Sequence, residues 1–259
     1  MSFKHFRREK IESYPNSERF LGGVQTRRIA SQMFIHYVSC DMKLLLTSSG
    51  ITNRTIANAF FDLIGKRPEE TTLAFIPTAS NVEQGDKWWV IEDLNRLREL
   101  KLKSIDIVDI SALSKTVWLP RLEESDILYF EGGNSYHLMG CIRSSGLEEL
   151  LPSLLEQRLY VGVSAGSMIT SKDLQLGLSQ TLYEEDLDRG AEMRGLGYID
   201  TFVLPHLNSE WFKHLRSEHM KGVIGNTENL YYAIDDQTAL VVLDGTITVV
   251  GEGDHLLIT

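Results

Sequence analysis

Short, continuous apolar runs alternate with helix-forming segments along most of the chain, and this alternation constrains the fold most. Segments between the runs, such as 88–97 and 147–154, carry apolar residues at helical spacing. Because the runs do not alternate with polar residues, we expect strands covered on both faces, as in a parallel sheet. The pattern predicts an α/β fold with a doubly wound, mostly parallel sheet flanked by helices. The predicted strands are 43–47, 72–77, 104–110, 127–130 and 159–163.

The chain divides into a basic leader and a long α/β region. Residues 1–41 carry a net charge of about +3, against about −13 for the rest. The leader lacks the apolar segment and cleavage site of a secretory signal, and its three glutamates disfavour an organellar presequence. We expect a poorly ordered extension or an upstream start codon, because Met42 directly precedes the first strand. Residues 42–259 are expected to form a single catalytic domain.

A β-hairpin is predicted near the end of this region. The runs 240–243 and 246–250 flank Asp244-Gly245, a dipeptide that favours the tight turn of a hairpin. No internal repeat or low-complexity linker interrupts residues 42–259. The hairpin therefore belongs to the same expected domain.

The composition excludes several classes of protein. With 26 Lys and Arg against 36 Asp and Glu, the formal charge of −10 disfavours a nucleic-acid partner. No apolar run approaches the roughly 18 residues that span a bilayer. Two cysteines, Cys40 and Cys141, are too few for a disulfide scaffold and fit free thiols in a reducing cytosol. No residue group has metal-ligand spacing, so we expect no metal or cofactor, and a homodimer is the default assembly.

The sharpest local motif is G-x-S-x-G at 162–166, directly after an apolar run. Glycines on both sides of a serine allow a tight strand-to-helix turn that exposes the hydroxyl of Ser164. The same turn places the Ala165 N–H at a helix N-terminus, where it would stabilise an oxyanion. The motif predicts a nucleophilic serine, and close packing without catalysis is the alternative.

A serine nucleophile needs a histidine base and a carboxylate that orients the base. Of seven histidines, His206 ends the apolar run 202–205, so we expect it at the carboxyl end of the sheet, where α/β proteins build their sites. A structural histidine is the alternative. The carboxylate is sought between Ser164 and His206, where the acidic cluster Glu184, Glu185 and Asp186 lies, and spacing does not choose among the three.

A second glycine turn, Gly132-Gly133-Asn134, follows the predicted strand 127–130. Its backbone N–H groups suit an oxyanion hole or a phosphate alike. The chain has no G-x-G-x-x-G or Walker sequence, so nucleotide binding has little support.

Three motifs together resemble the peptidase E (aspartyl dipeptidase) family, over nearly all of 42–259. These are Gly132-Gly133-Asn134, the serine motif 162–167 and Pro205-His206-Leu207-Asn208, with similar segments at 42–48 and 75–79. The resemblance implies a class I glutamine-amidotransferase-like α/β fold and a cytoplasmic serine peptidase acting on short peptides. Better-known members cleave dipeptides that begin with Asp, and cyanophycinases, which cut β-aspartyl-arginine units, are relatives.

The resemblance also implies roles for individual residues. Ser164 would be the nucleophile, His206 the general base, and the N–H groups of Gly133 and Ala165 the oxyanion hole. The family's separation from the histidine favours Glu184 as the third member, with Glu185 and Asp186 as substitutes. Asn134 and Arg216 would bind substrate.

One departure concerns specificity. Peptidase E follows its histidine with Gly-Glu-Thr-Arg, whose arginine binds the aspartate of the substrate, whereas residues 213–220 read Lys-His-Leu-Arg-Ser-Glu-His-Met. Arg216 could replace that contact or be an exposed helical arginine, so Asp specificity is not assigned. An α/β-hydrolase esterase and a non-catalytic binding protein are the alternative functions.

Overall fold

The structure is a computed structural model that describes residues 42–185 and 194–259. The expected extension, residues 1–41, lies outside the described residues, as does Cys40. Within the described ranges, none of the helices is both long and apolar enough to cross a bilayer.

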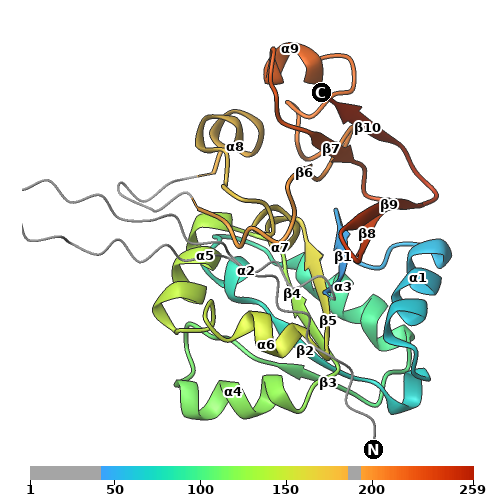
Figure 1. Ribbon diagram of the computed structural model, residues 1–259, viewed down its shortest axis with the longest axis vertical. Coiled ribbons are helices and arrows are strands. Elements are labelled where there is room, and N and C mark those ends of the chain that lie inside the picture. The colour runs from blue at the N-terminus through green and yellow to red at the C-terminus, as the bar shows by residue number, and fades with distance from the viewer. Residues whose placement is uncertain (1–41, 186–193) are drawn as a thin grey trace, which may run out of the picture. The chain divides into compact units, whose positions relative to one another are not determined.

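A seven-stranded sheet forms the centre of the molecule (Figure 1). Its strand order is β3-β2-β4-β5-β1-β8-β9, in which the first five strands are parallel and β8 and β9 form the predicted antiparallel hairpin. This confirms the predicted α/β fold. Two strands end earlier than expected: β2 ends at Ile76 rather than at residue 77, and β3 ends at Ile107 rather than at residue 110. The strands are β1 (Lys43–Thr47), β2 (Thr72–Ile76), β3 (Ser104–Ile107), β4 (Ile127–Phe130), β5 (Leu159–Val163), β8 (Thr238–Leu243) and β9 (Thr246–Gly251).

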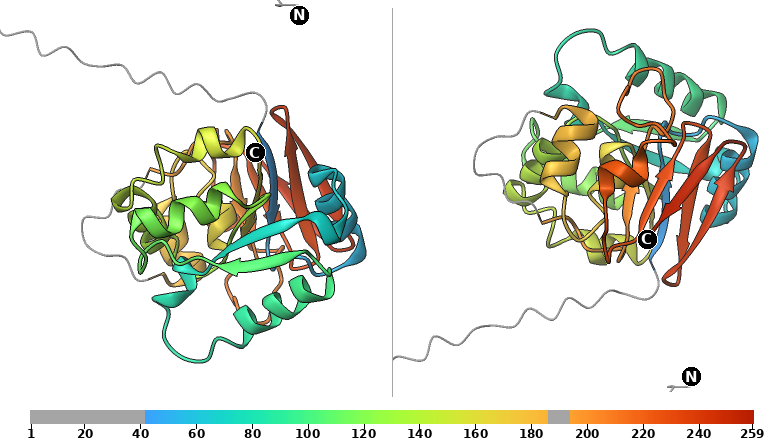
Figure 2. Two further views of the ribbon diagram at one scale, coloured as in Figure 1. Left: turned by 90° about the horizontal axis from the view of Figure 1, so that it is seen from below. Right: turned by 90° about the horizontal axis from the view of Figure 1, so that it is seen from above.

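Helices connect the strands and cover both faces of this sheet (Figure 2). The predicted helix at 88–97 is α3, whereas the helix expected over 147–154 begins only at Leu151, after turns at 148–150. The helices are α1 (Arg54–Ile64), α2 (Thr78–Asn81), α3 (Trp88–Glu99), α4 (Lys115–Glu123), α5 (Ser135–Ser144), α6 (Leu151–Leu155), α7 (Ala165–Met168), α8 (Leu176–Tyr183) and α9 (Met220–Ile224), with a 3₁₀ turn at Pro68–Glu70.

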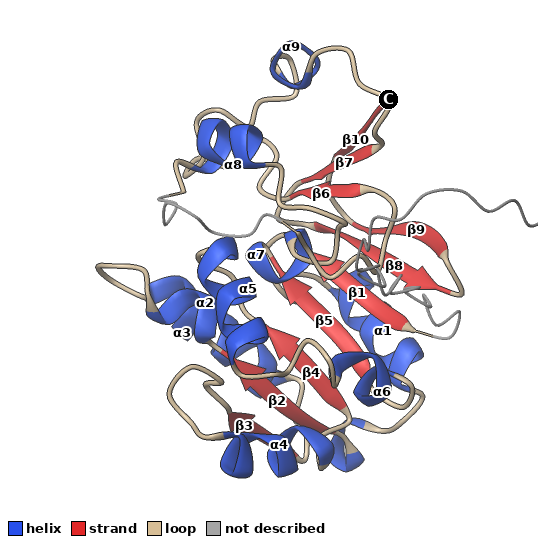
Figure 3. Cartoon of the chain, turned by 60° about the vertical axis from the view of Figure 1, so that its left-hand side comes forward, coloured by secondary structure: helices blue, strands red, loops and turns tan. Residues whose placement is uncertain are grey.

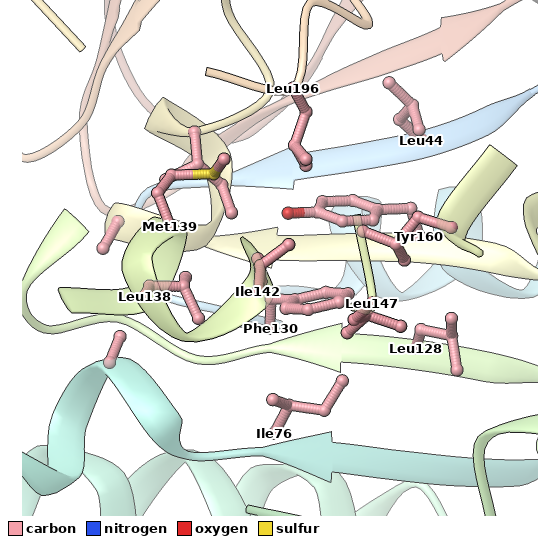
Figure 4. Packing of buried hydrophobic residues seen from close by; sticks show 14 of the residues in the cluster. Leu44, Ile76, Leu128, Phe130, Leu138, Met139, Ile142, Leu147, Tyr160 and Leu196 are labelled. Atoms are coloured by element: carbon pink, nitrogen blue, oxygen red, sulfur yellow. The ribbon is translucent and has the colours of Figure 1, made fainter. Parts of the chain in front are cut away.

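The strands β1, β2, β4, β5 and β8 each contribute to two hydrophobic cores, because successive side chains point to opposite faces. Leu44 and Leu46 of β1 pack into the core under α4, α5 and α6, while Leu45 packs into the core under α1 and α3. Figure 4 shows the first core, in which the stacked rings of Phe130 and Tyr160 have centroids 4.8 Å apart. The continuous apolar runs of the sequence thus reflect burial on both sides.

A second, three-stranded sheet lies beyond the end of the main sheet where α7 is found (Figure 3). Its order is β10-β7-β6, with β6 (Phe202–Leu204), β7 (Tyr231–Ile234) and β10 (His255–Ile258). A small apolar cluster that includes Leu182 and Leu215 packs against it. The expectation that the run 202–205 belongs to the main sheet is therefore wrong, because β6 pairs with β7 and not with a strand of the larger sheet.

Candidate active site

Ser164 lies on a sharp turn between β5 and α7. Its backbone has φ 47° and ψ −108°, a conformation that a non-glycine residue adopts only under strain. A Cβ at Gly162 would lie 2.6 Å from the backbone of Gly166, and one at Gly166 would lie 2.2 Å from the carbonyl oxygen of Phe130. Both glycines of the motif are therefore needed for close packing. The structure confirms the tight strand-to-helix turn, with Ser164 only half-buried at its apex.

His206 follows β6 and faces Ser164. Its Nε2 lies 2.9 Å from the Ser164 Oγ, although the two residues come from different sheets. The ring of Phe212 stacks on the imidazole, with centroids 4.5 Å apart and planes 17° apart. The structure thus brings together the predicted nucleophile and the predicted base, and Phe212 limits how the imidazole can turn.

The carboxylate beside His206 is Asp236, in the turn between β7 and β8. Its Oδ1 lies 2.7 Å from the His206 Nδ1. Ser48 links the two residues, because its hydroxyl donates to the Asp236 Oδ1 over 2.5 Å and accepts the backbone N–H of His206 over 2.8 Å. An ionised carboxylate can only accept, so the Nδ1 carries the proton and the Nε2 is free to accept from Ser164.

The surroundings of Asp236 favour its ionised form. Partial burial alone would raise the pKa of this carboxyl, but the hydrogen bond and charge of His206, together with the Ser48 hydroxyl, outweigh burial and hold the pKa below its ordinary value. A charged Asp236 is suited to hold an imidazole in one orientation and to stabilise it when it becomes protonated.

The sequence-based choice of Glu184 as this carboxylate is wrong. The Glu184 side chain is 80% exposed and lies 3.5 Å from the Nε2 of His214, not beside His206. Glu185 accepts the backbone N–H of Ser135 over 2.8 Å, and burial raises the pKa of its carboxyl. Asp186 lies outside the described residues. The acid beside His206 does not lie between Ser164 and His206, as the sequence predicted, but follows the histidine in the chain.

A positional signal for Asp236 was present in the sequence. Asp236 comes two residues after the apolar strand β7, as His206 comes two residues after β6. Like His206, Asp236 is a polar residue just past the end of a strand, a position from which side chains reach the sites of α/β proteins. Ser48, one residue after β1, fits the same description.

The Gly132-Gly133 turn packs against the serine. A Cβ at Gly132 would lie 3.1 Å from the Cβ of Ser164 and 3.8 Å from its Oγ. Gly133 has φ +128°, and a Cβ there would lie 2.3 Å from the carbonyl oxygen of Ala79, so only glycine fits this position. Gly133 and Ala165, the predicted oxyanion-hole residues, thus lie on the two turns that meet at Ser164.

The two predicted substrate-binding residues have structural contacts. The Asn134 Oδ1 caps α5 by accepting the N–H of His137 over 2.9 Å. Arg216 lies in an irregular segment rather than in the expected helix, and its Nη1 donates to the carbonyl oxygens of Ser209, over 2.8 Å, and Phe212, over 3.0 Å. Arg216 therefore braces the loop that carries Phe212 against His206.

Comparisons with known proteins identify the family of the chain. Residues 44–250 match the model of peptidase family S51. An uncharacterized peptidase of Listeria innocua is 30% identical over 179 residues, which cover 67% of this chain and 81% of the relative. One of Pasteurella multocida is 28% identical over 169 residues, or 64% and 77% of the two chains.

Solved structures of similar fold carry peptidase names as well. A protein of Listeria monocytogenes described as a candidate peptidase E has a TM-score of 0.67 and 25% identity, over 82% of this chain and all of that one. A peptidase from an acI-B1 Actinobacterium has a TM-score of 0.60 at 22% identity, which supports the fold alone. The chain is a peptidase that belongs to family S51 and has a peptidase E-like fold.

Proposed function

We propose that this peptidase is a serine exopeptidase that hydrolyses short peptides through an acyl-enzyme on Ser164. The observation that carries the proposal is the continuous path of hydrogen bonds from the Ser164 Oγ through His206 to Asp236, with distances of 2.9 and 2.7 Å. A serine hydroxyl becomes nucleophilic when a base removes its proton, and here that base is already in contact and oriented.

The reaction follows from these contacts. The Ser164 oxygen attacks the scissile carbonyl carbon while its proton passes to the His206 Nε2, and the N–H groups of Gly133 and Ala165 stabilise the oxyanion. The imidazolium then donates that proton to the leaving amine, the C–N bond breaks, and an ester to Ser164 remains. Water attacks the ester, His206 accepts its proton, and the proton returns to the Ser164 oxygen as the acid product leaves.

The substrate class rests on the resemblance to peptidase E. We propose dipeptides, of the Asp-X or isoaspartyl type, as substrates of this enzyme in the cytoplasm. The arginine that binds aspartate in peptidase E has no counterpart in sequence, and Arg216 contacts backbone carbonyl oxygens. A direct comparison of Asp-X with other dipeptides therefore decides whether the enzyme prefers Asp.

The test is a panel of Asp-X, isoaspartyl and apolar dipeptides assayed with the wild type and with Ser164→Ala. We expect Ser164→Ala to lower kcat by about 10⁴-fold or more while thermal stability is kept, because the nucleophile is lost. A fluorophosphonate should label the wild type and the matched surface variant Ser153→Ala, but not Ser164→Ala. Unlabelled, folded wild-type protein, or peptide hydrolysis that survives in Ser164→Ala, would reject the mechanism.

A further inference from the structure

Two buried carboxyl groups lie directly behind the Gly132-Gly133 turn. Asp93 comes from α3 and Glu131 from the residue before the turn, and the two carboxyl groups lie close enough that each shifts the pKa of the other. Asp93 is 3% exposed and Glu131 is 1% exposed. The Asp93 Oδ1 and the Glu131 Oε2 are both buried and have no donor among the described residues. Nothing in the proposed reaction uses either group.

A single shared proton accounts for this contact. Two ionised carboxylates in contact repel each other in a buried space, and neither can donate a hydrogen bond, whereas one protonated carboxyl donates to the other. Burial raises the pKa of both groups, and the neighbouring Asp93 raises the pKa of Glu131 further, well above its ordinary value. The pair then carries one negative charge, and the oxygens that the two carboxyl groups turn toward each other are joined by a hydrogen bond.

The groups around the pair stabilise one negative charge and not two. The Tyr129 hydroxyl donates to the Asp93 Oδ2 over 2.6 Å, and the neighbouring backbone N–H of Gly132 lowers the pKa of the Glu131 carboxyl. The one nearby cation, among the described residues, is Arg96, whose Nη1 lies 3.9 Å from the Asp93 Oδ1. Glu92 neutralises part of that cation, because it lies 2.8 Å from the Arg96 Nη2.

The pair contacts two turns of the active site. Through Gly132 it reaches the turn that packs on Ser164. On the other side lies Gly50, where a Cβ would be 2.2 Å from the Asp93 Oδ1, and the Arg96 Nη1 donates to the Ser49 carbonyl oxygen over 2.8 Å. These residues follow Ser48, which holds His206 and Asp236.

We propose that Asp93 and Glu131 share one proton and act as positioning residues, holding the Gly132-Gly133 turn and the Ser48–Gly50 turn in place for catalysis. The inference rests on the proposed serine peptidase mechanism. When alkaline pH removes the shared proton, two buried negative charges repel, Glu131 moves away from Asp93, and its hold on the Gly132 N–H is lost. The enzyme should then lose activity at alkaline pH although His206 is still a competent base.

The first test compares pH profiles of kcat and KM. Glu131→Gln keeps a hydrogen-bond donor but has no proton to lose, so we expect kcat near neutral pH within about threefold of wild type and the alkaline loss of kcat to move to higher pH or disappear. Glu131→Ala should lower kcat about 10- to 100-fold with little change in KM, because the turn is misplaced. Glu99→Gln removes an equal charge from the exposed surface of α3, leaves the ion pair of Glu92 with Arg96 in place, and should show neither effect.

The second test detects the proton itself and does not need catalysis. Infrared spectra at neutral pH should contain a carboxylic acid C=O stretching band that is absent in Glu131→Gln, and the difference spectrum separates it from other buried acids such as Glu185. Asp93→Asn should remove the same band if Glu131→Gln does not fold. If Ser164→Ala retains activity but the band is present, the serine mechanism fails and the shared proton stands. If the band is absent, or Glu131→Gln keeps the wild-type alkaline loss, the proposal is overturned.

Discussion

Asp236 and the pair Asp93–Glu131 are carboxyl groups close to the same serine, but their surroundings favour opposite protonation states. Asp236 is 34% exposed and accepts hydrogen bonds from His206 and Ser48, which lower its pKa. Asp93 and Glu131 are buried against each other, and burial raises the pKa of both. Donors and solvent thus favour the charged form of Asp236, whereas burial favours a protonated carboxyl in the Asp93–Glu131 pair.

The largest effect is expected for Asp236→Asn, which tests whether a charged Asp236 orients His206. We expect its kcat to fall about 10⁴-fold. An amide at this position can donate to the Nδ1, so the imidazole proton would move to the Nε2, which could then no longer accept the proton of Ser164. Steady-state kinetics on the best substrate of the panel, with thermal unfolding to check the fold, measures the effect. Glu184→Gln is the matched control. A large loss of kcat in that variant, and not in Asp236→Asn, would mean that Glu184 orients the histidine.

Ser48→Ala should lower kcat by a smaller factor than Asp236→Asn. The variant removes the hydroxyl that donates to Asp236 and leaves the backbone N–H of His206 without its acceptor. We expect kcat to fall about tenfold and the protein to lose roughly 1–3 kcal/mol of stability. Kinetics and denaturant unfolding measure both, with Ser49→Ala as the neighbouring control. Unchanged kcat would mean that Phe212 and Asp236 position His206 without help.

The smallest effect is a difference in how stability depends on pH. The pKa of Asp236 is lowered on folding, so its stabilisation is present above its ordinary pKa of 3.8 and is lost as pH falls through the folded value. The pKa of Glu131 is raised, so its stabilisation is present below 4.5 and is lost as pH rises toward the folded value.

The opposite pKa shifts of Asp236 and Glu131 can be tested with two variants whose free energy of unfolding is measured against pH. Relative to wild type, Glu131→Gln should become more stable as pH rises above about 4.5, by at most about 1.4 kcal/mol per pH unit for one proton. The stability deficit of Asp236→Asn should shrink as pH falls below about 4. Parallel pH dependence in the two variants would contradict the opposite protonation of the two groups.

Local sequence patterns predicted the central sheet and the serine turn well. The apolar runs at β1, β2, β4 and β5 follow from burial on both faces, which is a property of each strand alone. The turn at Ser164 depends on glycines two residues away, so its geometry is also determined by neighbouring residues in the sequence. His206 was found because a residue just past a strand end tends to reach the site.

The acids were missed because their partners are distant in the chain. Asp236 meets His206 because β6 pairs with β7 in the second sheet, while β8, which follows Asp236, pairs with β1. The smaller sheet was not predicted, and its short strands have little periodicity of their own. Asp93 lies on α3, whose sequence alone resembles an ordinary charged helix, and only the folded chain buries Asp93, where it accepts a hydrogen bond from Tyr129 of β4.

The sequence by itself determined the α/β class, the peptidase E-like family and the pair of Ser164 and His206, because these depend on motifs and on the apolar pattern within single elements. Only the tertiary structure decided which carboxylate orients the histidine and which carboxyls are buried together. The charge state of an acid depends on every donor and charge that surrounds it, and those neighbours are assembled from segments that only folding brings into contact.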